Sequence, residues 1–79
     1  MPTLLRLFGL RFFFWSREHK PIHVHVESSD GIAKFEIETK VRLVENHGLQ
    51  PKDIKLAESI LEENRELLIM EWNNYHGKN

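Results

Sequence analysis

The sequence predicts an α+β fold: an antiparallel β-meander of three to four strands, followed by a short helix and a long C-terminal helix packed on the sheet. Two observations support this prediction. Apolar and polar residues alternate through much of residues 3–38, which is the two-residue period of strands. After Pro51 the apolar residues recur at helical spacing, and no breaker follows before Gly77. Because the chain has 79 residues, we expect one domain that spans residues 1–79.

Two strands are predicted at the N-terminus, over residues 3–8 and 10–16, with Gly9 as the turn between them. The second strand is apolar on both faces, because four aromatic residues follow one another at 12–15. A strand of this kind usually lies inside a sheet and is covered on both sides. We expect a helix on one face, and a partner chain is a candidate cover for the other.

A β-hairpin is predicted over residues 22–38. Residues 22–27 and 32–38 both alternate, and four residues typical of turns separate them. One face of the hairpin is apolar, and we expect it to join the core. The opposite face is polar, and we expect it at the surface. It carries His23, His25, Glu27, Lys34, Glu36 and Glu38.

The register of this hairpin depends on its turn. The Asp-Gly pair at 30–31 favours a two-residue type I′ turn, which sets His25 opposite Glu36. A four-residue loop keeps the same faces but sets His25 opposite Lys34. We favour the first register because its polar pairs are charge-complementary, which contributes about 0.2–1 kcal/mol per pair.

The C-terminal half predicts helices. Residues 41–48 are expected to form the short helix, closed by Gly48. Pro51 suits the first position of the second helix, which we expect to run for roughly 25 residues. Its apolar residues form two adjoining stripes, wide enough to cover the sheet and to leave an edge for a second subunit. The stripes comprise Ile54, Ala57, Leu61, Leu68, Trp72 and Tyr75, and beside them Leu56, Ile60, Leu67 and Met70.

Composition limits the classes of function. The chain has no cysteine, which excludes disulfides and thiolate metal sites. The absence of cysteine also fits a reducing cytosol, so we expect a cytoplasmic protein. No apolar run approaches the ~18–20 residues of a membrane span, so we expect no membrane contact. The net charge is −1, although residues 1–25 carry four basic residues and one acidic residue. This modest basic end gives weak support to nucleic-acid binding. A helix-turn-helix outline over residues 41–61 is disfavoured because its second helix is acidic.

The His-x-His pair at positions 23 and 25 is the first candidate for chemistry. Both side chains leave one strand on the same face, about 6–7 Å apart at Cα. His23, His25 and Glu36 across the hairpin could together hold a divalent metal such as zinc. Two surface histidines that pair with glutamates on the next strand are the simpler interpretation. We therefore expect no cofactor, with zinc as the alternative.

A histidine could also act as a general acid or base in a metal-free RNA-cleaving site, with nearby basic residues holding phosphate. The catalytic candidates are His23, His25, Arg11 and Glu18. The stretch around residues 11–15 also resembles the basic and aromatic surfaces on which bases stack, although a contiguous aromatic strand is more often core. The binding candidates are Arg11, Phe13, Trp15, Arg17 and Lys20.

Taken together, several short motifs resemble a family of short bacterial proteins catalogued as domain of unknown function 4160. The motifs are Met1-Pro2-Thr3, Arg11-Phe12-Phe13-Phe14-Trp15-Ser16, Glu18, Pro21, His23-Val24-His25-Val26, Ala33-Lys34-Phe35 and the helix opening from Gly48 to Pro51. Two positions depart from the family pattern, Trp15 where tyrosine is expected and Glu36 where an aromatic residue is expected. The resemblance implies genes paired with another small protein, in arrangements similar to toxin–antitoxin modules. It implies a partner but no catalytic residue.

The leading interpretation is a cytosolic protein-interaction module, one half of a toxin–antitoxin-like pair, that binds through the sheet face or an exposed helix edge. Its expected partner is a small protein encoded by a neighbouring gene, and a homo-oligomer is also compatible with the wide helix face. One alternative is a small RNA-cleaving or metal-dependent hydrolase that uses His23 and His25. Another is a metal-binding or nucleic-acid-binding regulator.

Overall fold

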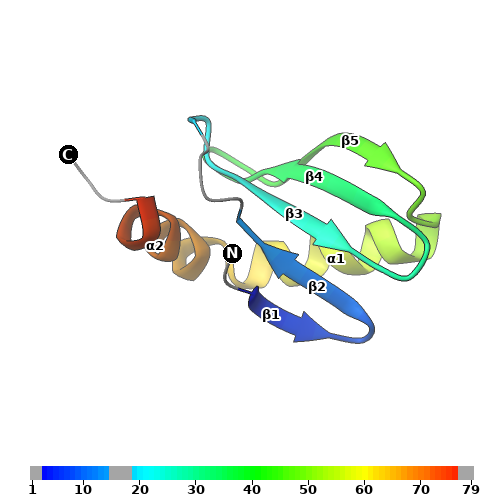
Figure 1. Ribbon diagram of the computed structural model, residues 1–79. Helices are drawn as coiled ribbons and strands as arrows, with labels where there is room; N and C mark the ends of the chain where they lie inside the picture. The colour runs from blue at the N-terminus through cyan, green and yellow to red at the C-terminus, as the bar shows by residue number, and fades with distance from the viewer. Residues whose placement is uncertain (1–2, 15–18, 77–79) are drawn as a thin grey trace.

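Within residues 3–14 and 19–76, which the computed structural model describes, five antiparallel strands form one sheet and two helices follow (Figure 1). Each strand pairs with the next along the chain, so the sheet is a meander. The α+β class is therefore confirmed, with more strands than the three to four predicted. The strands are β1 (Thr3–Leu7), β2 (Leu10–Phe13), β3 (His23–Glu27), β4 (Ile32–Glu36) and β5 (Arg42–His47), and the helices are α1 (Pro51–Glu63) and α2 (Arg65–His76).

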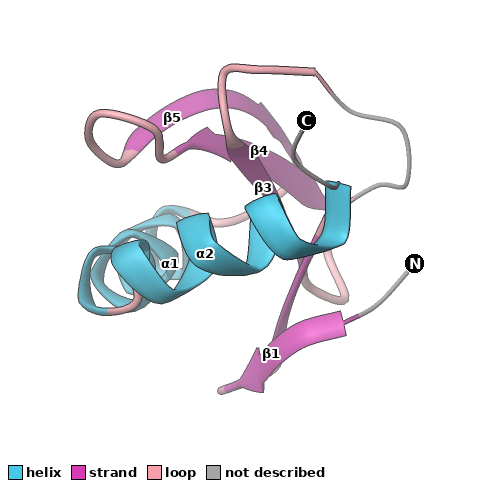
Figure 2. Cartoon of the chain, turned by 90° about the vertical axis from the view of Figure 1, so that its left-hand side faces the viewer, coloured by secondary structure: helices cyan, strands magenta, loops and turns pink. Residues whose placement is uncertain are grey.

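The core lies between one face of the sheet and the helices, which both lie on the same side of it (Figure 2). Residues directly opposite each other on neighbouring strands share a face. Val26 pairs with Phe12 on one side and Ala33 on the other, and all three are buried. Burying one large apolar side chain stabilises the fold by about 1.5–3 kcal/mol. The helices contribute Ala57, Ile60, Leu61, Leu68 and Trp72 to this core.

The prediction of a short helix over residues 41–48 is wrong, because this segment forms β5. Leu43 lies opposite Phe35 and packs against the core, as a strand residue does. The register shifts between Lys34 and Phe35, so β5 has an extra residue there. That bulge interrupts the apolar alternation and gives the segment a false helical pattern. Since the predicted first helix is a strand, the helix-turn-helix outline does not form.

The preferred hairpin register is also wrong. His23 lies opposite Glu36 and His25 opposite Lys34, which is the register of a four-residue loop. Inside that loop the backbone N–H of Ser28 donates to the carbonyl of Gly31 at 2.9 Å. Glycine is needed at position 31 because the backbone of His47 and Gly48 passes close to it, not because the turn is tight. A Cβ there would lie 2.1 Å from the carbonyl oxygen of His47.

The single long helix is a further correction. The chain forms a helix of 13 residues and one of 12, separated at Asn64. The side-chain amide of Asn64 donates to the carbonyl of Ile60 at 2.8 Å, and its own carbonyl accepts from the N–H of Leu68 at 2.9 Å. Arg65, the first residue of α2, donates through Nε to the carbonyl of Ile37 at 2.7 Å, and through Nη2 to the carbonyl of Glu38. These bonds bind the junction of the helices to the end of the sheet.

No helix in the described part of the chain combines the length and the apolar character needed to cross a membrane.

Candidate functional site

The sheet face opposite the helices, here called the outer face, brings several candidate residues together. Phe13 on β2 lies opposite His25 on β3, and His23 lies two residues before His25. Arg11 shares this face because it lies opposite Glu27. Strand alternation in the sequence groups Arg11 with Phe13 and His23 with His25, and the pairing of β2 with β3 brings both groups to one face. Three other candidates, Trp15, Arg17 and Glu18, lie outside the described residues.

The two histidines are buried, which contradicts the prediction that they lie at the surface. Only 7% of His23 and 5% of His25 is exposed. Their rings meet edge to face with centroids 5.4 Å apart, and His25 also stacks on Phe13 at 5.5 Å. Nδ1 of His23 donates to the carbonyl of Pro21 at 2.7 Å, because a carbonyl can only accept. This bond fixes the orientation of the His23 ring.

Helix α2 contacts the same cluster, and no pattern in the sequence indicated this contact. The ring of Trp72 lies 5.4 Å from that of His23 and 5.2 Å from that of Phe14, the latter edge to face. His76, one turn further along α2, lies 4.0 Å from Trp72. The histidine pair is therefore continuous with an aromatic cluster that joins the end of β3 to α2. This packing is one cause of the burial of His23.

Arg11 already has partners on the outer face. Its Nε donates to Oε1 of Glu27 at 2.9 Å, and its guanidinium carbon lies 4.1 Å from the ring centroid of Phe13. A guanidinium over an aromatic face contributes on the order of 0.5–1 kcal/mol at a partly exposed site. Phe13 is consequently covered within the chain, and a partner subunit is not required to bury it.

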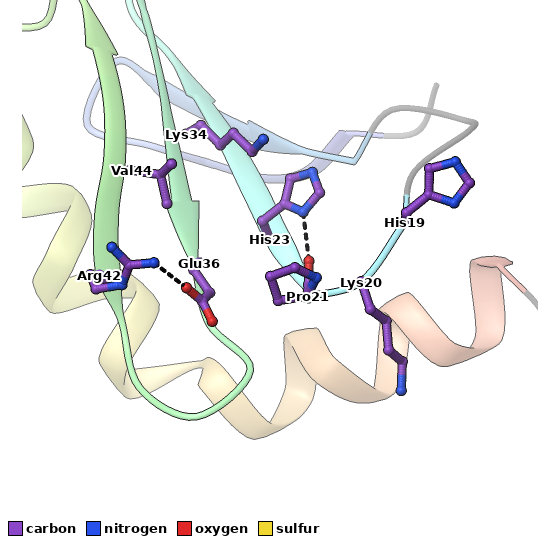
Figure 3. Close-up of a pocket in the computed structure, with 8 residues that line it drawn as sticks. All are labelled: His19, Lys20, Pro21, His23, Lys34, Glu36, Arg42 and Val44. Carbon is purple, nitrogen blue, oxygen red and sulfur yellow. Dashed lines mark hydrogen bonds and ion pairs between the residues drawn. The ribbon is translucent and has the colours of Figure 1, made fainter.

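A pocket of about 460 Å³ opens on the outer face beside His23 (Figure 3). Lys34 comes from β4, and Arg42 comes from β5. Arg42 was missed because residues 41–48 were predicted as a helix. Lys34 lay on the predicted polar face of the hairpin but was not among the candidate site residues. Nη2 of Arg42 donates to Oε1 of Glu36 at 2.6 Å. The pocket is lined by His19, Lys20, Pro21, His23, Lys34, Glu36, Arg42 and Val44.

The zinc site stays a prediction. Glu36, its predicted third ligand, lies opposite His23 rather than His25 and is bonded to Arg42. Across residues 3–14 and 19–76, no group of three His, Cys, Asp or Glu side chains is placed to hold a metal ion. The geometry of the histidine pair among aromatic rings resembles a packed cluster more closely than a coordination site.

A second concave surface, here called the β1–α2 groove, lies between the first strand and the last helix. It has a volume of about 410 Å³. Leu67, on its wall, is 46% exposed and Tyr75 is 41% exposed, while the neighbouring Met70 is 52% exposed. These are residues of the predicted stripes that the break in the helix leaves outside the core. The groove is lined by Leu4, Leu5, Leu67, Leu68, Glu71, Asn74 and Tyr75.

The fold and its outer face define a small α+β protein with a buried histidine pair on a five-stranded meander. Residues 9–73 match the family model described as Domain of unknown function (DUF4160), so the chain belongs to this family. The family resemblance predicted from the motifs is confirmed, and the match includes the histidine pair and all the residues that line its pocket. No curated protein and no solved structure shows a match to the chain.

Proposed function

We propose that the protein is a protein-interaction module whose β1–α2 groove binds an extended segment of a partner protein. The groove itself is the observation that carries this proposal, because exposed leucine and tyrosine side chains surround a concave apolar surface. Exposed apolar surface with polar residues at its rim is typical of protein–protein contact sites. The proposed partner is the small protein of a neighbouring gene, in a cytoplasmic pair that resembles a toxin–antitoxin module.

The chemistry of the groove indicates what it would bind. In the described part of the chain β1 pairs only with β2, so one edge of β1 is available for another strand (Figure 1). A segment added there would place alternate side chains against Leu67 and Tyr75. Among the described residues that line the groove, Glu71 is the one that carries a charge. The complementary segment is therefore apolar on one face and carries a lysine or arginine opposite Glu71.

The proposal is tested by size-exclusion chromatography with light scattering, on the protein alone and with the neighbouring gene product. We expect a stoichiometric complex that Leu67→Glu abolishes. The matched control is Val44→Glu, which introduces the same charge at a similarly exposed position on β5. A monomer indifferent to the neighbouring protein would overturn the proposal. A homodimer sensitive to Leu67→Glu would overturn the choice of partner, since a second copy would then occupy the groove.

A second candidate function, RNA cleavage, rests on the histidine pair. Two imidazoles with centroids 5.4 Å apart, one of them oriented by a backbone carbonyl, could divide the roles of general acid and base. Their burial ranks this candidate second, because only 7% of His23 and 5% of His25 is exposed, which leaves little ring surface for proton transfer to a substrate. The test compares growth arrest and RNA integrity after expression of wild type and of the His23→Ala/His25→Ala double variant. His47→Ala, at an exposed histidine, is the control. Equal behaviour of wild type and the folded double variant would exclude catalysis by this pair.

A further inference from the structure

We propose that the pocket beside His23 binds a phosphate group, with Lys34 and Arg42 as its main ligands. The two side chains come from adjacent strands and line one concave surface of the outer face (Figure 3). This site is separate from the β1–α2 groove, because no described residue lines both. The proposal therefore does not depend on the partner-binding function.

The pocket carries a surplus of positive charge. Among the described residues that line the pocket, Glu36 is the one carboxylate, and its ion pair with Arg42 is neutral overall. Lys34 and Lys20 form no ion pair within the described residues. Among the described lining residues, with the histidines counted as neutral, the surplus is thus two positive charges, one from Lys34 and one from Lys20. For a protein with a net charge of −1, this is a local concentration of cations.

Two carboxylates near the pocket are already engaged. Glu45 lies opposite Lys34 in the register of β4 and β5, but its Oε1 lies 3.2 Å from Nε2 of His47. Glu38, at the other end of the face, accepts a hydrogen bond from the backbone N–H of Ile22 at 3.0 Å. Neither is among the lining residues of the pocket. Within the described residues, Lys34 therefore has no carboxylate partner and is available to an anion from outside the chain.

The number and type of donors favour phosphate over a carboxylate ligand. A phosphate monoester carries about −1.5 to −2 charges at neutral pH, which matches the surplus, whereas a carboxylate carries one. The ammonium of Lys34 has three donors, and Arg42 keeps further N–H groups beyond the one given to Glu36. Lys20 also lines the pocket, and its side chain extends toward α2 in Figure 3. Its flexible stem allows it to close over a bound anion.

The pocket is larger than a phosphate ion. Its volume of about 460 Å³ falls within the ~300–1,000 Å³ range of small-molecule sites. Pro21 and Val44 supply apolar lining, and the exposed His19 lines the pocket as well. The phosphate could therefore arrive as the free ion or as part of a phosphate ester. The two sources share the same contacts with Lys34 and Arg42.

The test is a two-dimensional NMR titration of the full chain with inorganic phosphate, AMP and adenosine as probes. We expect phosphate or AMP to shift the amide signals of β4, β5 and residues 19–23, and adenosine to leave them unchanged. The tighter of the two binding probes identifies the source. Lys34→Gln is expected to weaken binding by roughly 10–100-fold, the effect of losing one charge-assisted hydrogen bond of about 1.5–3 kcal/mol. Lys55→Gln, at an exposed lysine on α1, is the matched control and should bind as wild type does.

Several results would overturn the proposal. They are no shift with phosphate or AMP at millimolar concentration, an equal response to adenosine, or equal loss of binding in the Lys34 and Lys55 variants. Arg42→Gln is the second variant, and it should fold because this arginine is exposed. It should weaken binding as well, and unchanged binding in both pocket variants would refute the site. Leu67→Glu should bind phosphate normally, which separates this result from that of the groove experiment.

Discussion

Arg65 is expected to be one of the most important single side chains for stability, and replacing it by methionine tests this. Its guanidinium donates to the carbonyls of Ile37 and Glu38, so that it joins the start of α2 to the chain that follows β4. Methionine keeps the apolar stem and a similar helix propensity but removes every donor. The substitution therefore isolates the hydrogen bonds. Arg65→Lys keeps the charge and can donate to one carbonyl at most. Its free energy of unfolding should therefore lie between those of wild type and Arg65→Met.

The magnitude follows from the contacts. A hydrogen bond to a charged group contributes about 1.5–3 kcal/mol, and a buried acceptor left without a donor costs on the order of 1–3 kcal/mol. Ile37 is buried, so water does not easily replace the guanidinium there, whereas the partly exposed Glu38 can be hydrated. We expect Arg65→Met to lower the free energy of unfolding by about 2–3 kcal/mol. For a domain of this size, that corresponds to roughly 10–20 °C in Tm.

Urea denaturation followed by far-UV circular dichroism measures this loss. The matched control is Arg42→Met. Arg42 also bonds another strand through its guanidinium, but its partner is the side chain of Glu36 and the pair lies at the surface. An exposed ion pair contributes about 0–1 kcal/mol, so the control should remain close to wild type. If Arg65→Met unfolds at the same urea concentration as Arg42→Met, the assigned role of the two carbonyl contacts is incorrect.

Two further predictions use the same denaturation assay. Gly31→Ala should cost more than about 2 kcal/mol, because the new Cβ would lie 2.1 Å from the backbone oxygen of His47, which cannot move without shifting β5. Gly9→Ala should cost only about 1–2 kcal/mol, since its φ of +80° is strained for alanine but nothing lies within 4 Å; equal losses for the two glycines would argue against the close approach. Leu68→Ala should cost about 2–5 kcal/mol because Leu68 is buried in the core. The adjacent exposed Leu67 should tolerate the same change within about 0.5 kcal/mol, and a large loss there would mean that the groove is part of the core.

The faces of the strands could be predicted from the sequence, but their register could not. The apolar alternation at 22, 24 and 26 and at 33, 35 and 37 is sufficient to place these residues in the core, as observed. The same alternation fits both the two-residue and the four-residue loop, so it cannot choose between them. The Asp-Gly signal favoured the shorter loop. The observed register instead accompanies a tertiary contact, the approach of Gly31 to the end of β5, which no local pattern reveals.

The end of the sheet and the helix break were missed for related reasons. In β5 the bulge opposite Lys34 interrupts the alternation, so a strand that pairs with β4 resembles the start of a helix. At residue 64 no proline or glycine marks the end of α1. The interruption coincides with the hydrogen bonds that Arg65 makes to the end of the sheet, which lie 27 and 28 residues away along the chain. Both errors therefore come from contacts between segments distant in sequence.

In the candidate site, too, the sequence indicates which side chains share a strand face but not how deeply they are buried. The alternation within each strand groups Arg11 with Phe13 and His23 with His25, and the observed pairing of β2 with β3 sets both groups on one face. Burial depends on what covers that face, and here Phe13 stacks on His25 while Trp72 of α2 meets His23. The aromatic contacts thus give the histidine pair a structural role that a surface pair would lack.

This packing also explains why the available positive charge lies beside the histidines rather than on Arg11. Arg11 is held over Phe13 by Glu27, and it covers the aromatic end of the outer face. Two strands further along, Lys34 has no such partner in the described part of the chain. Because the pocket lies on β3, β4 and β5 and the groove lies on β1 and α2, the two concave surfaces use different ends of the sheet. One chain could therefore hold a phosphate and a protein partner at the same time, and binding of each should leave the affinity for the other unchanged unless the sheet itself is deformed.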